Sequence, residues 1–586
     1  MSTVAVMGRE GRFGFRWPKI QVVPWIIFIV VALSVVTPLT FLVLGSFSAE
    51  KLPTDLNLTQ LNLDNYRKVW LTPDTYNVVW NTMVYVVGAT IFGIGVAAAL
   101  AWLVERTNVP GKMWIYAGVP MTLVMPGMLQ AMAYVLLLSP RIGFLNKLLV
   151  AVGFSPINIY SLGGMIFLEG LRLIPTAFLM LVPLLRSMDP SLEEAAATSG
   201  ARPSSTLRKV TLRLMLPGLI AITIYQAMTA LEAFEIPGIL GMPGNIYVFS
   251  TRVYSIIHSM DGIPNYGEAN ALSVVYVVLA LIATYFYARV ISHSERYTII
   301  SGKGYRPREL NLGVLRWPAA GLVSLVLLFS IILPFLALFY ISLLPYVQQP
   351  SAAAWRVMSF ANYVTFWESD RIGKTLQNTA IMVVVTSTVT VFLSFMISMV
   401  IVRSKFWGRR ILDQLAFVPH AIPGIVMGIA FLWLFLKGRS IGIDLFGTIW
   451  SLVIAFTVGF IAYGTRAMSA AILQIHKDLE EAAHVSGAPQ WRTMWRIFVP
   501  LLLPTFIGVW IWSMLQSVRQ AGKPLLLTEG SENEVLAVLV WRLWNQGDIG
   551  VVGAIGTLLI VVMMLITCLL RVFGFRRGAA VQQANH

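Results

Sequence analysis

The chain has 586 residues, of which 57% are hydrophobic and only 12% are charged, about half the charged fraction of an average soluble domain. Its long apolar runs reach the roughly 20 residues that a bilayer-spanning helix needs, so the composition indicates a membrane protein. The net charge of +16 does not indicate nucleic-acid binding, because the basic residues lie in short loops beside apolar runs. The single cysteine, Cys568, excludes an intramolecular disulfide and a cysteine metal cluster.

The first predicted span follows a basic N-terminal segment. Arg9, Arg12, Arg16 and Lys19 precede an apolar run at about residues 24–47. This run is too long for the core of a signal peptide, and no typical cleavage site follows it. We therefore expect a retained helix whose N-terminus lies in the cytoplasm.

The apolar runs of spanning length divide into two sets of six. The first set lies near residues 24–46, 78–104, 113–139, 160–185, 214–237 and 271–292. The second set lies near residues 317–344, 376–402, 411–436, 445–470, 499–525 and 551–573. The most basic connector separates the sets, so we predict a first half at residues 1–300 and a second half at residues 301–586. Alternating loops then place both termini in the cytoplasm.

The two halves repeat one another in sequence. Four pairs recur 297 positions later, as between residues 81 and 378, and the spacing falls to 287 near the end of each half. Each half holds an even number of spans, so the repeat is parallel, with an axis along the membrane normal. We expect an all-α membrane protein of two similar bundles with a passage between them. The repeated pairs are Asn65-Tyr66 and Asn362-Tyr363, Asn81-Thr82 and Asn378-Thr379, Gly111-Lys112 and Gly408-Arg409, and Pro126-Gly127 and Pro423-Gly424.

One predicted cytoplasmic loop in each half carries the same motif. Residues 193–217 read EEAAATSGARPSSTLRKVTLRLMLP, and residues 480–504 read EEAAHVSGAPQWRTMWRIFVPLLLP. A short helix is expected to begin near Ser191 or Asp478, with glutamates in its first turn, where the helix dipole favours them. Alanines keep one face small enough for a partner to approach, glycine ends the helix, and a second, basic helix leads to the next span.

A single copy of this motif is consistent with an ordinary amphipathic loop, but two copies at equivalent places favour a shared docking role. The candidate docking residues are the glutamates, alanines and glycines that the copies share. They are Glu193, Glu194, Ala195, Ala196, Gly200 and Ala201 in the first half, and Glu480, Glu481, Ala482, Ala483, Gly487 and Ala488 in the second.

These loops resemble the EAA loop of ABC importer permeases, in which the letters EAA are followed by three residues and a glycine. The resemblance covers nearly the whole chain, and the fused layout is similar to the type I permeases of ferric-iron importers. Residues 302–308 resemble the connector of that group, whereas Arg519-Gln520 stands where its second halves often carry Arg-Glu. The resemblance implies that each loop is a coupling helix docked on one of two ABC ATPase subunits. It also implies a periplasmic or lipid-anchored substrate-binding protein and a place in the bacterial inner membrane.

The sequence offers no site for ATP hydrolysis. A phosphate-binding loop requires G-x-x-x-x-G-K-[ST], and at the nearest match, Gly373-Lys374-Thr375, the first glycine is replaced by Glu368. We therefore expect ATP and magnesium to bind a separate subunit. For this chain we expect no cofactor, no metal site, no catalytic residues and no nucleic-acid partner, with membrane lipid around the spans.

Charged residues inside spans are costly and usually functional. Glu232 and Glu235 lie in the fifth predicted span of the first half, and Arg519 and Lys523 lie near the equivalent positions of the second. We predict that they line the translocation pathway, where opposite charges pair across the axis when the pathway is closed. An interhelical salt bridge, or a place near the outer membrane surface, is the alternative. Pro237 and Pro524 are expected to end both segments.

A second matched pair, Arg252 and Arg542, lies outside the membrane in this topology. We predict contact with the substrate-delivery protein, the alternative being an ordinary solvated or structural charge. The resemblance suggests ferric iron as the substrate, with thiamine, a polyamine, a phosphonate or another small organic solute left open. A secondary transporter with parallel repeats is the competing class, and paired docking loops argue against it.

Overall fold

The computed structural model describes residues 22–49, 59–186, 188, 190–258, 264–294 and 309–584. The basic N-terminal residues Arg9, Arg12, Arg16 and Lys19 and the connector residues 302–308 lie outside the described residues. Ten helices are long and apolar enough to cross a membrane, or up to twelve if each of two sharply bent helix pairs counts as one span. The prediction of an all-α polytopic membrane protein is confirmed.

Both halves use the same order of long helices, although the second half has no helix equivalent to α6 among its described residues. The first half contains α1 (Val22–Ser46), α2 (Asp64–Leu71), α3 (Pro73–Arg106), α4 (Lys112–Met121), α5 (Gly127–Leu138), α6 (Phe144–Ala151), α7 (Leu162–Arg186), α8 (Pro190–Thr198), α9 (Pro203–Thr206), α10 (Leu212–Glu232), α11 (Phe249–Ile257) and α12 (Tyr266–Ser294). The second half contains α13 (Arg316–Leu327), α14 (Leu333–Ser342), α15 (Ala352–Val357), α16 (Ala361–Glu368), α17 (Asp370–Arg403), α18 (Arg409–Phe417), α19 (Gly424–Arg439), α20 (Ile449–Gln474), α21 (Lys477–Val485), α22 (Gln490–Thr493), α23 (Val499–Arg519), α24 (Gly522–Leu527), α25 (Leu536–Gln546) and α26 (Ile549–Ala584).

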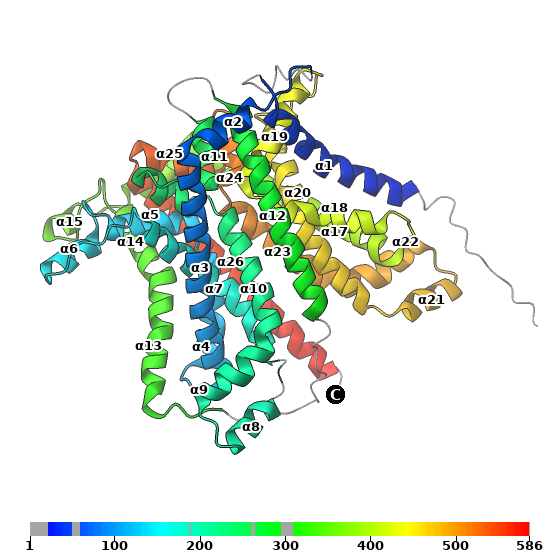
Figure 1. Ribbon diagram of the computed structural model, residues 1–586, viewed down its shortest axis with the longest axis horizontal. Helices are drawn as coiled ribbons and strands as arrows, with labels where there is room; N and C mark the ends of the chain where they lie inside the picture. Colours follow the sequence, from blue (N-terminus) through cyan, green and yellow to red (C-terminus); the bar gives the residue numbers. More distant parts are fainter. Residues whose placement is uncertain are drawn as a thin grey trace, which may run out of the picture.

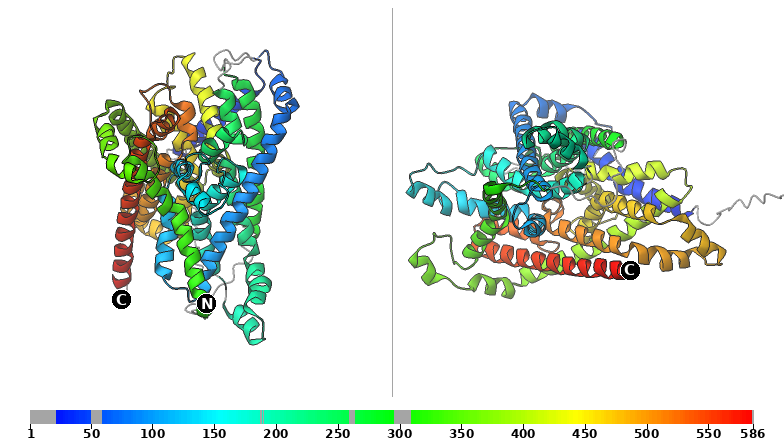
Figure 2. Two further views of the ribbon diagram at one scale, coloured as in Figure 1. Left: turned by 90° about the vertical axis from the view of Figure 1, so that its left-hand side faces the viewer. Right: turned by 90° about the horizontal axis from the view of Figure 1, so that it is seen from below.

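The long helices pack in equivalent pairs within the two halves. In the first half α3 packs on α7, and α10 packs on both; in the second, α17 packs on α20, and α23 packs on both. In Figure 1, α3, α7 and α10 lead down to α8 at the bottom, whereas α17 and α23 lead to α21 at the right. Seen from below, α26 runs along the side of the molecule opposite α3 (Figure 2).

The first span of each half also packs on the other half; in the second half, α13 and α14 form this span, joined by a π-helical turn. Helix α1 lies against α18 and α19, and α14 lies against α5. Helix α5 is almost completely buried, and α19 is buried continuously from Ile425 to Trp433, as expected for apolar helices at the centre of a bundle. The two halves therefore interlock around α5 and α19.

The repeated Asn-Tyr pairs fasten the end of the first helix in each half. The Asn65 amide donates to the carbonyl oxygen of Ser46 at 3.2 Å, and the Tyr66 hydroxyl lies 2.8 Å from the Ser46 hydroxyl. The Asn362-Tyr363 pair bonds Ser342 in the same way, at 2.9 and 2.8 Å. These bonds satisfy carbonyl groups that the end of a helix leaves without an intrahelical partner, which explains why the pair recurs.

Replacing Asn65 with alanine should lower the thermal stability of the purified chain. The buried Asn65 amide also donates to the Ser48 carbonyl oxygen at 2.8 Å, so Asn65→Ala removes two buried hydrogen bonds, at a cost of about 1–3 kcal/mol. The measurement is the melting temperature in detergent. Asn545→Ala is the control, because its amide donates only to Trp541 of the same helix and is exposed. Equal melting temperatures for the two variants would contradict the fastening role.

Two predicted spans are wrong in shape. The runs at residues 113–139 and 411–436 are not straight helices, because α4 meets α5 at 93° and α18 meets α19 at 111°. Both breaks fall at the repeated Pro-Gly pairs. A proline disfavours helical dihedrals in the residue before it, and both preceding residues, Met125 and Ile422, are extended.

Two further spans end earlier than predicted. Helix α10 stops at Glu232 and α23 stops at Arg519, each followed by an extended residue. Pro237 and Pro524 do not end these spans, which corrects that prediction. Pro237 opens a π-helical turn, η4 (Pro237–Gly241), and Pro524 lies in the first turn of α24, where its missing N–H is tolerated.

Candidate functional site

Four helix breaks meet at the centre of the molecule and enclose a small polar cavity. Its volume is about 90 Å³. It lies where α10 and α23 end and where α5 and α19 begin, and seven residues from each half line it. They are Gly127, Arg172, Thr229, Glu232, Ala233, Phe234 and Glu235 in the first half, and Gly424, Ile425, Gln516, Arg519, Gln520, Gly522 and Lys523 in the second.

This cavity brings together the four charged residues that the sequence placed in the pathway, Glu232, Glu235, Arg519 and Lys523. Glu235 and Lys523 lie beyond the ends of the span helices rather than inside them. The start of α19 approaches the acidic side closely, because a Cβ atom on Gly424 would lie at van der Waals distance, 3.8 Å, from Glu232 Oε1.

Glu235 connects the two halves through backbone amides. Its Oε1 atom accepts a hydrogen bond from the Ala521 N–H of the second half at 3.1 Å, and its Oε2 atom accepts one from the Phe234 N–H at 3.4 Å. Phe234 and Ala521 are 287 positions apart, so they are equivalent in the repeat. Gly522, the equivalent of Glu235, has no side chain, so the Glu235 carboxylate alone accepts the hydrogen bonds from both equivalent amides.

The basic residues do not form the expected ion pairs. Among the described residues no ion pair joins Glu232 or Glu235 to Arg519 or Lys523. Arg519 Nη1 donates to Gln516 Oε1 at 3.4 Å, and Lys523 Nζ donates to Gln520 Oε1 at 3.2 Å. Lys523 Nζ also lies 4.7 Å from the centre of the Phe456 ring, a cation–π distance. The predicted pairing of opposite charges is thus wrong for this conformation.

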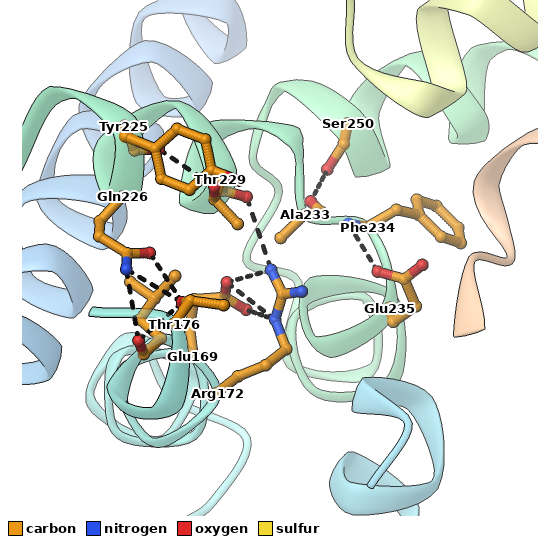
Figure 3. Close-up of polar contacts among 11 residues, drawn as sticks. Glu169, Arg172, Thr176, Tyr225, Gln226, Thr229, Ala233, Phe234, Glu235 and Ser250 are labelled. Carbon is orange, nitrogen blue, oxygen red and sulfur yellow. Dashed lines mark hydrogen bonds and ion pairs between the residues drawn. The ribbon is translucent and has the colours of Figure 1, made fainter. Parts of the chain in front are cut away.

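A further pair of charges was missed from the sequence. Glu169 is fully buried in α7, and the Arg172 guanidinium, one turn later, donates through Nε to both carboxylate oxygens at 3.0 and 3.1 Å (Figure 3). Arg172 also reaches the Thr229 carbonyl oxygen at 3.5 Å, so the pair holds α7 to the end of α10. The two residues could have been found from the sequence, because they are charged residues within the apolar run at residues 160–185.

The formal charges around the cavity balance. Glu169, Glu232 and Glu235 provide three acidic groups, whereas Arg172, Arg519 and Lys523 provide three basic groups. A balanced set gives no electrostatic preference for a cation or an anion. The cavity therefore carries no argument for a particular substrate.

The two motif loops fold as short helices ended by glycine. Helices α8 and α21 begin at Pro190 and Lys477, next to the predicted starts. Gly200 and Gly487 have φ values of +80° and +75°, which glycine adopts with little strain. The turns close by equivalent hydrogen bonds of 3.0 Å, from Ala201 N–H to Ala196 O and from Ala488 N–H to Ala483 O, the pattern of a Schellman motif.

The basic segments after these glycines are not separate helices. In the first half, α9 continues through a π-helical turn into the span helix α10. In the second half, α22 continues in the same way into α23. This corrects the prediction of a separate second helix in each loop.

The first glutamate of each motif holds its loop to the end of a span. Arg106, at the end of α3, donates to the Leu185 carbonyl oxygen at 2.9 Å and forms an ion pair with Glu193 at 3.0 Å. In the second half, Arg403 donates to the Ile472 carbonyl oxygen at 3.1 Å, and its Nε lies 4.0 Å from Glu480 Oε2. Glu481, by contrast, is exposed, and Glu194 is half-buried.

Changing Arg106 to glutamine should weaken ATP-driven transport, because Glu193 loses the buried cation that positions α8. Glu193→Gln in the same chain should restore part of the loss, since charged neighbours typically show coupling free energies of about 0.5–3 kcal/mol. The measurement is a double-mutant cycle on transport rate. The equivalent cycle on Arg403 and Glu480, whose charges are farther apart at 4.0 Å, should give weaker coupling. Additive losses at both sites would contradict the positioning role.

The two arginines predicted to contact a delivery protein have different surroundings. Arg542 Nη2 lies 2.9 Å from Oε1 of Glu534, whose fully buried carboxylate also pairs with Arg371 at 2.9 Å. Burial raises the pKa of the Glu534 carboxyl, although Arg371 opposes the shift. Arg252 forms no ion pair among the described residues and lies 5.9 Å from the centre of the Tyr247 ring. Arg252 is thus the more available of the two for a partner.

Comparison with known proteins assigns the family. The family model described as binding-protein-dependent transport system inner membrane component matches residues 89–296 and 390–577, one match in each half. The chain belongs to this family. It is the membrane-spanning permease subunit of a binding-protein-dependent ABC importer, and it is a non-catalytic subunit.

Two relatives of the permease are ferric transport proteins by name. A ferric transport system permease protein of Actinobacillus pleuropneumoniae is 26% identical over 82% of this chain and 68% of its own length. A putative ferric transport system permease protein of Haemophilus influenzae is 26% identical over 75% of this chain and 67% of its own length. A solved bacterial ABC transporter that imports the acidic polysaccharide alginate shares 18% identity, with a TM-score of 0.35, over 47% of this chain and 96% of that chain.

Membership in this family implies an ATPase partner, a substrate-binding protein and a multi-pass location in the inner membrane. It also decides between the two transporter classes that the sequence left open, in favour of the ATP-driven importer over the ion-coupled carrier. Among the described residues no group of three or more histidine, cysteine, aspartate or glutamate side chains is placed to hold a metal ion.

Proposed function

We propose that this permease passes ferric iron from the periplasm to the cytoplasm, driven by ATP hydrolysis on two copies of a separate ATPase subunit. The observation that carries the proposal is the match over most of the chain to two relatives named as ferric transport permeases. Selectivity rests mainly with the substrate-binding protein, because the charges around the central cavity balance. Residues 1–300 and 301–586 act as two permease halves around one pathway.

The pathway runs between the halves through the central cavity. Glu232, Glu235, Arg519 and Lys523 line it in this proposal, which is supported by their shared cavity and by the cost of exposing such charges to lipid, at least about 2.5 kcal/mol for an arginine or aspartate at the membrane centre. A cavity of about 90 Å³ has room for only a few water molecules. The conformation described here is therefore closed at this level.

The two motif loops dock on the ATPase subunits in the cytoplasm. Their helices carry exposed apolar side chains beside the exposed alanines, namely Leu192 on α8, and Leu479 and Val485 on α21, which are 41%, 47% and 90% exposed. Exposed apolar side chains that project from a membrane protein into water favour burial against a partner. Both termini lie on the same side, as the basic loops near Arg403 and Arg409 support.

The substrate-binding protein delivers its cargo at the opposite side, where Arg252 and Arg542 lie in this topology. Because Arg542 already pairs with buried Glu534, Arg252 is the residue assigned to direct contact. Arg542 contributes by keeping the N-terminal part of α25 in place.

Uptake in cells tests the substrate. A strain without this permease should lose ATP-dependent uptake of radiolabelled ferric iron and regain it when the permease is restored. Uptake of thiamine, a polyamine and a phosphonate should not change. Restored uptake of one of these solutes, with iron uptake unaffected, would overturn iron as the substrate while leaving the permease assignment in place.

A further inference from the structure

The loop after α17 and the first turn of α18 present three cations that have no acidic partner among the described residues. Lys405, Arg409 and Arg410 are exposed, and none of them forms an ion pair with a described carboxylate. The nearby Asp413 is engaged by Arg466 at 3.2 Å. Together with Phe406 and Trp407, the three cations line an open hollow of about 340 Å³ at the surface.

One wall of the hollow belongs to an aromatic cluster shared with the first helix. Trp25 of α1 packs edge-to-face on Phe406 and Trp407, with ring centres 5.2 and 5.8 Å apart. Trp407 remains 67% exposed. Tryptophan beside basic residues at the end of a span is typical of the level of the lipid headgroups.

The equivalent loop of the first half has its cation neutralised by the protein. Lys112, the equivalent of Arg409 in the repeat, pairs with Glu309 at 2.8 Å. Asn108, the equivalent of Lys405, accepts a hydrogen bond from the Leu312 N–H at 2.9 Å. Segment 309–312 thus covers the first loop, whereas no described residue supplies an anion to the second.

We propose that the hollow binds the phosphate headgroup of an anionic membrane lipid such as phosphatidylglycerol. Basic pockets between spans on the cytoplasmic side suit such headgroups, and a guanidinium can engage two phosphate oxygens at once. The adjacent outer face of α1 is apolar and exposed, with Ile26 55%, Ile29 49% and Leu33 61% exposed. This face gives the acyl chains a surface that a free phosphate ion would not use. The positive-inside rule accounts for basic residues here, but it requires neither the hollow nor the aromatic wall.

Native mass spectrometry of the purified full chain tests the site. The chain should retain bound phosphatidylglycerol, and added phosphatidylcholine should not displace it. Each cation removed should weaken retention about fivefold, as expected for a basic residue near an anionic lipid surface, so the variant with Lys405→Gln, Arg409→Gln and Arg410→Gln should lose it. Lys112→Gln is the matched control and should retain lipid. The single variant Arg410→Gln, with an unchanged melting temperature, guards against misfolding of the triple variant.

Two outcomes would overturn the proposal. Equal retention by the triple variant and the unchanged chain would mean that the basic loop serves only membrane orientation. Displacement of the lipid by millimolar inorganic phosphate would mean that the hollow binds the ion rather than the lipid. In a chain with Cys568→Ser, lipid-independent cross-linking of Trp407→Cys to a cysteine placed within residues 1–21 would identify that segment as the occupant instead.

Discussion

Arginine in place of Gly487 should abolish ATP-driven transport while leaving the permease folded and inserted. Gly487 lies two residues after the end of α21 and has a φ of +75°, and an L-residue in this left-handed region costs about 1–2 kcal/mol. A Cβ atom at Gly487 would meet no other atom of the described chain within 4 Å. The turn is therefore not closely packed by this chain itself, and the arginine side chain would project into the space assigned to the ATPase. Transport and ATPase co-purification are the measurements.

Two control variants separate docking from backbone strain. Gly487→Asn should keep most transport, because asparagine reaches left-handed dihedrals more easily than other residues. Gly153→Arg places the same side chain at a glycine of φ +93° with equally open surroundings, but outside the motif loops, and should transport normally. Normal transport by Gly487→Arg would contradict the docking role. Equal loss in Gly153→Arg would point instead to a general defect in folding.

The sequence located most spans because their signal is local. A run such as residues 376–402 needs only its own apolar composition to indicate a helix, and α17 contains it entirely. Hydropathy does not distinguish a straight run from a bent one, so the breaks at Pro126 and Pro423 were missed. A proline inside an apolar run predicts that the helix ends just before it, and applying that rule would have found both breaks.

The candidate site was only partly predictable, for a physical reason. The 287-residue repeat places Glu232 opposite Arg519 without any structure, because equivalent residues of two similar halves lie at one level beside their common axis. Whether opposite charges pair depends on the direction of each side chain, which is set by where its helix ends. Helices α10 and α23 end at Glu232 and Arg519, and the sequence did not predict these ends. The bond from Ala521 to Glu235 uses a backbone group, which has no sequence signature.

Replacing Glu235 with alanine should favour the open pathway. The change removes the hydrogen bond between the halves and leaves the amides of Ala521 and Phe234 unpaired, at a cost of about 1–3 kcal/mol to the closed state. A shift of 1.4 kcal/mol changes an equilibrium tenfold, so roughly tenfold faster labelling of a cysteine at Thr229 is expected before ATP or receptor is added. The background should be Cys568→Ser, and ATP hydrolysis without receptor should rise in parallel.

Glutamine at Glu235 distinguishes the two ways in which this residue could close the pathway. The glutamine side chain keeps one carbonyl oxygen that can accept the Ala521 N–H bond, but it has no charge. If the backbone bond of 3.1 Å closes the pathway, Glu235→Gln should label nearly as slowly as the unchanged permease. The alternative is that the pathway is closed by an ion pair between Glu235 and Arg519 that forms in another state. In that case the cysteine at Thr229 should be labelled as fast in Glu235→Gln and in Arg519→Gln as in Glu235→Ala. Slow labelling of all three variants, with transport intact, would leave Glu235 as a buried structural group without a role in gating. The bond to an equivalent amide of the opposite half favours the first outcome, because separating the halves must break that bond, whereas no ion pair needs to break.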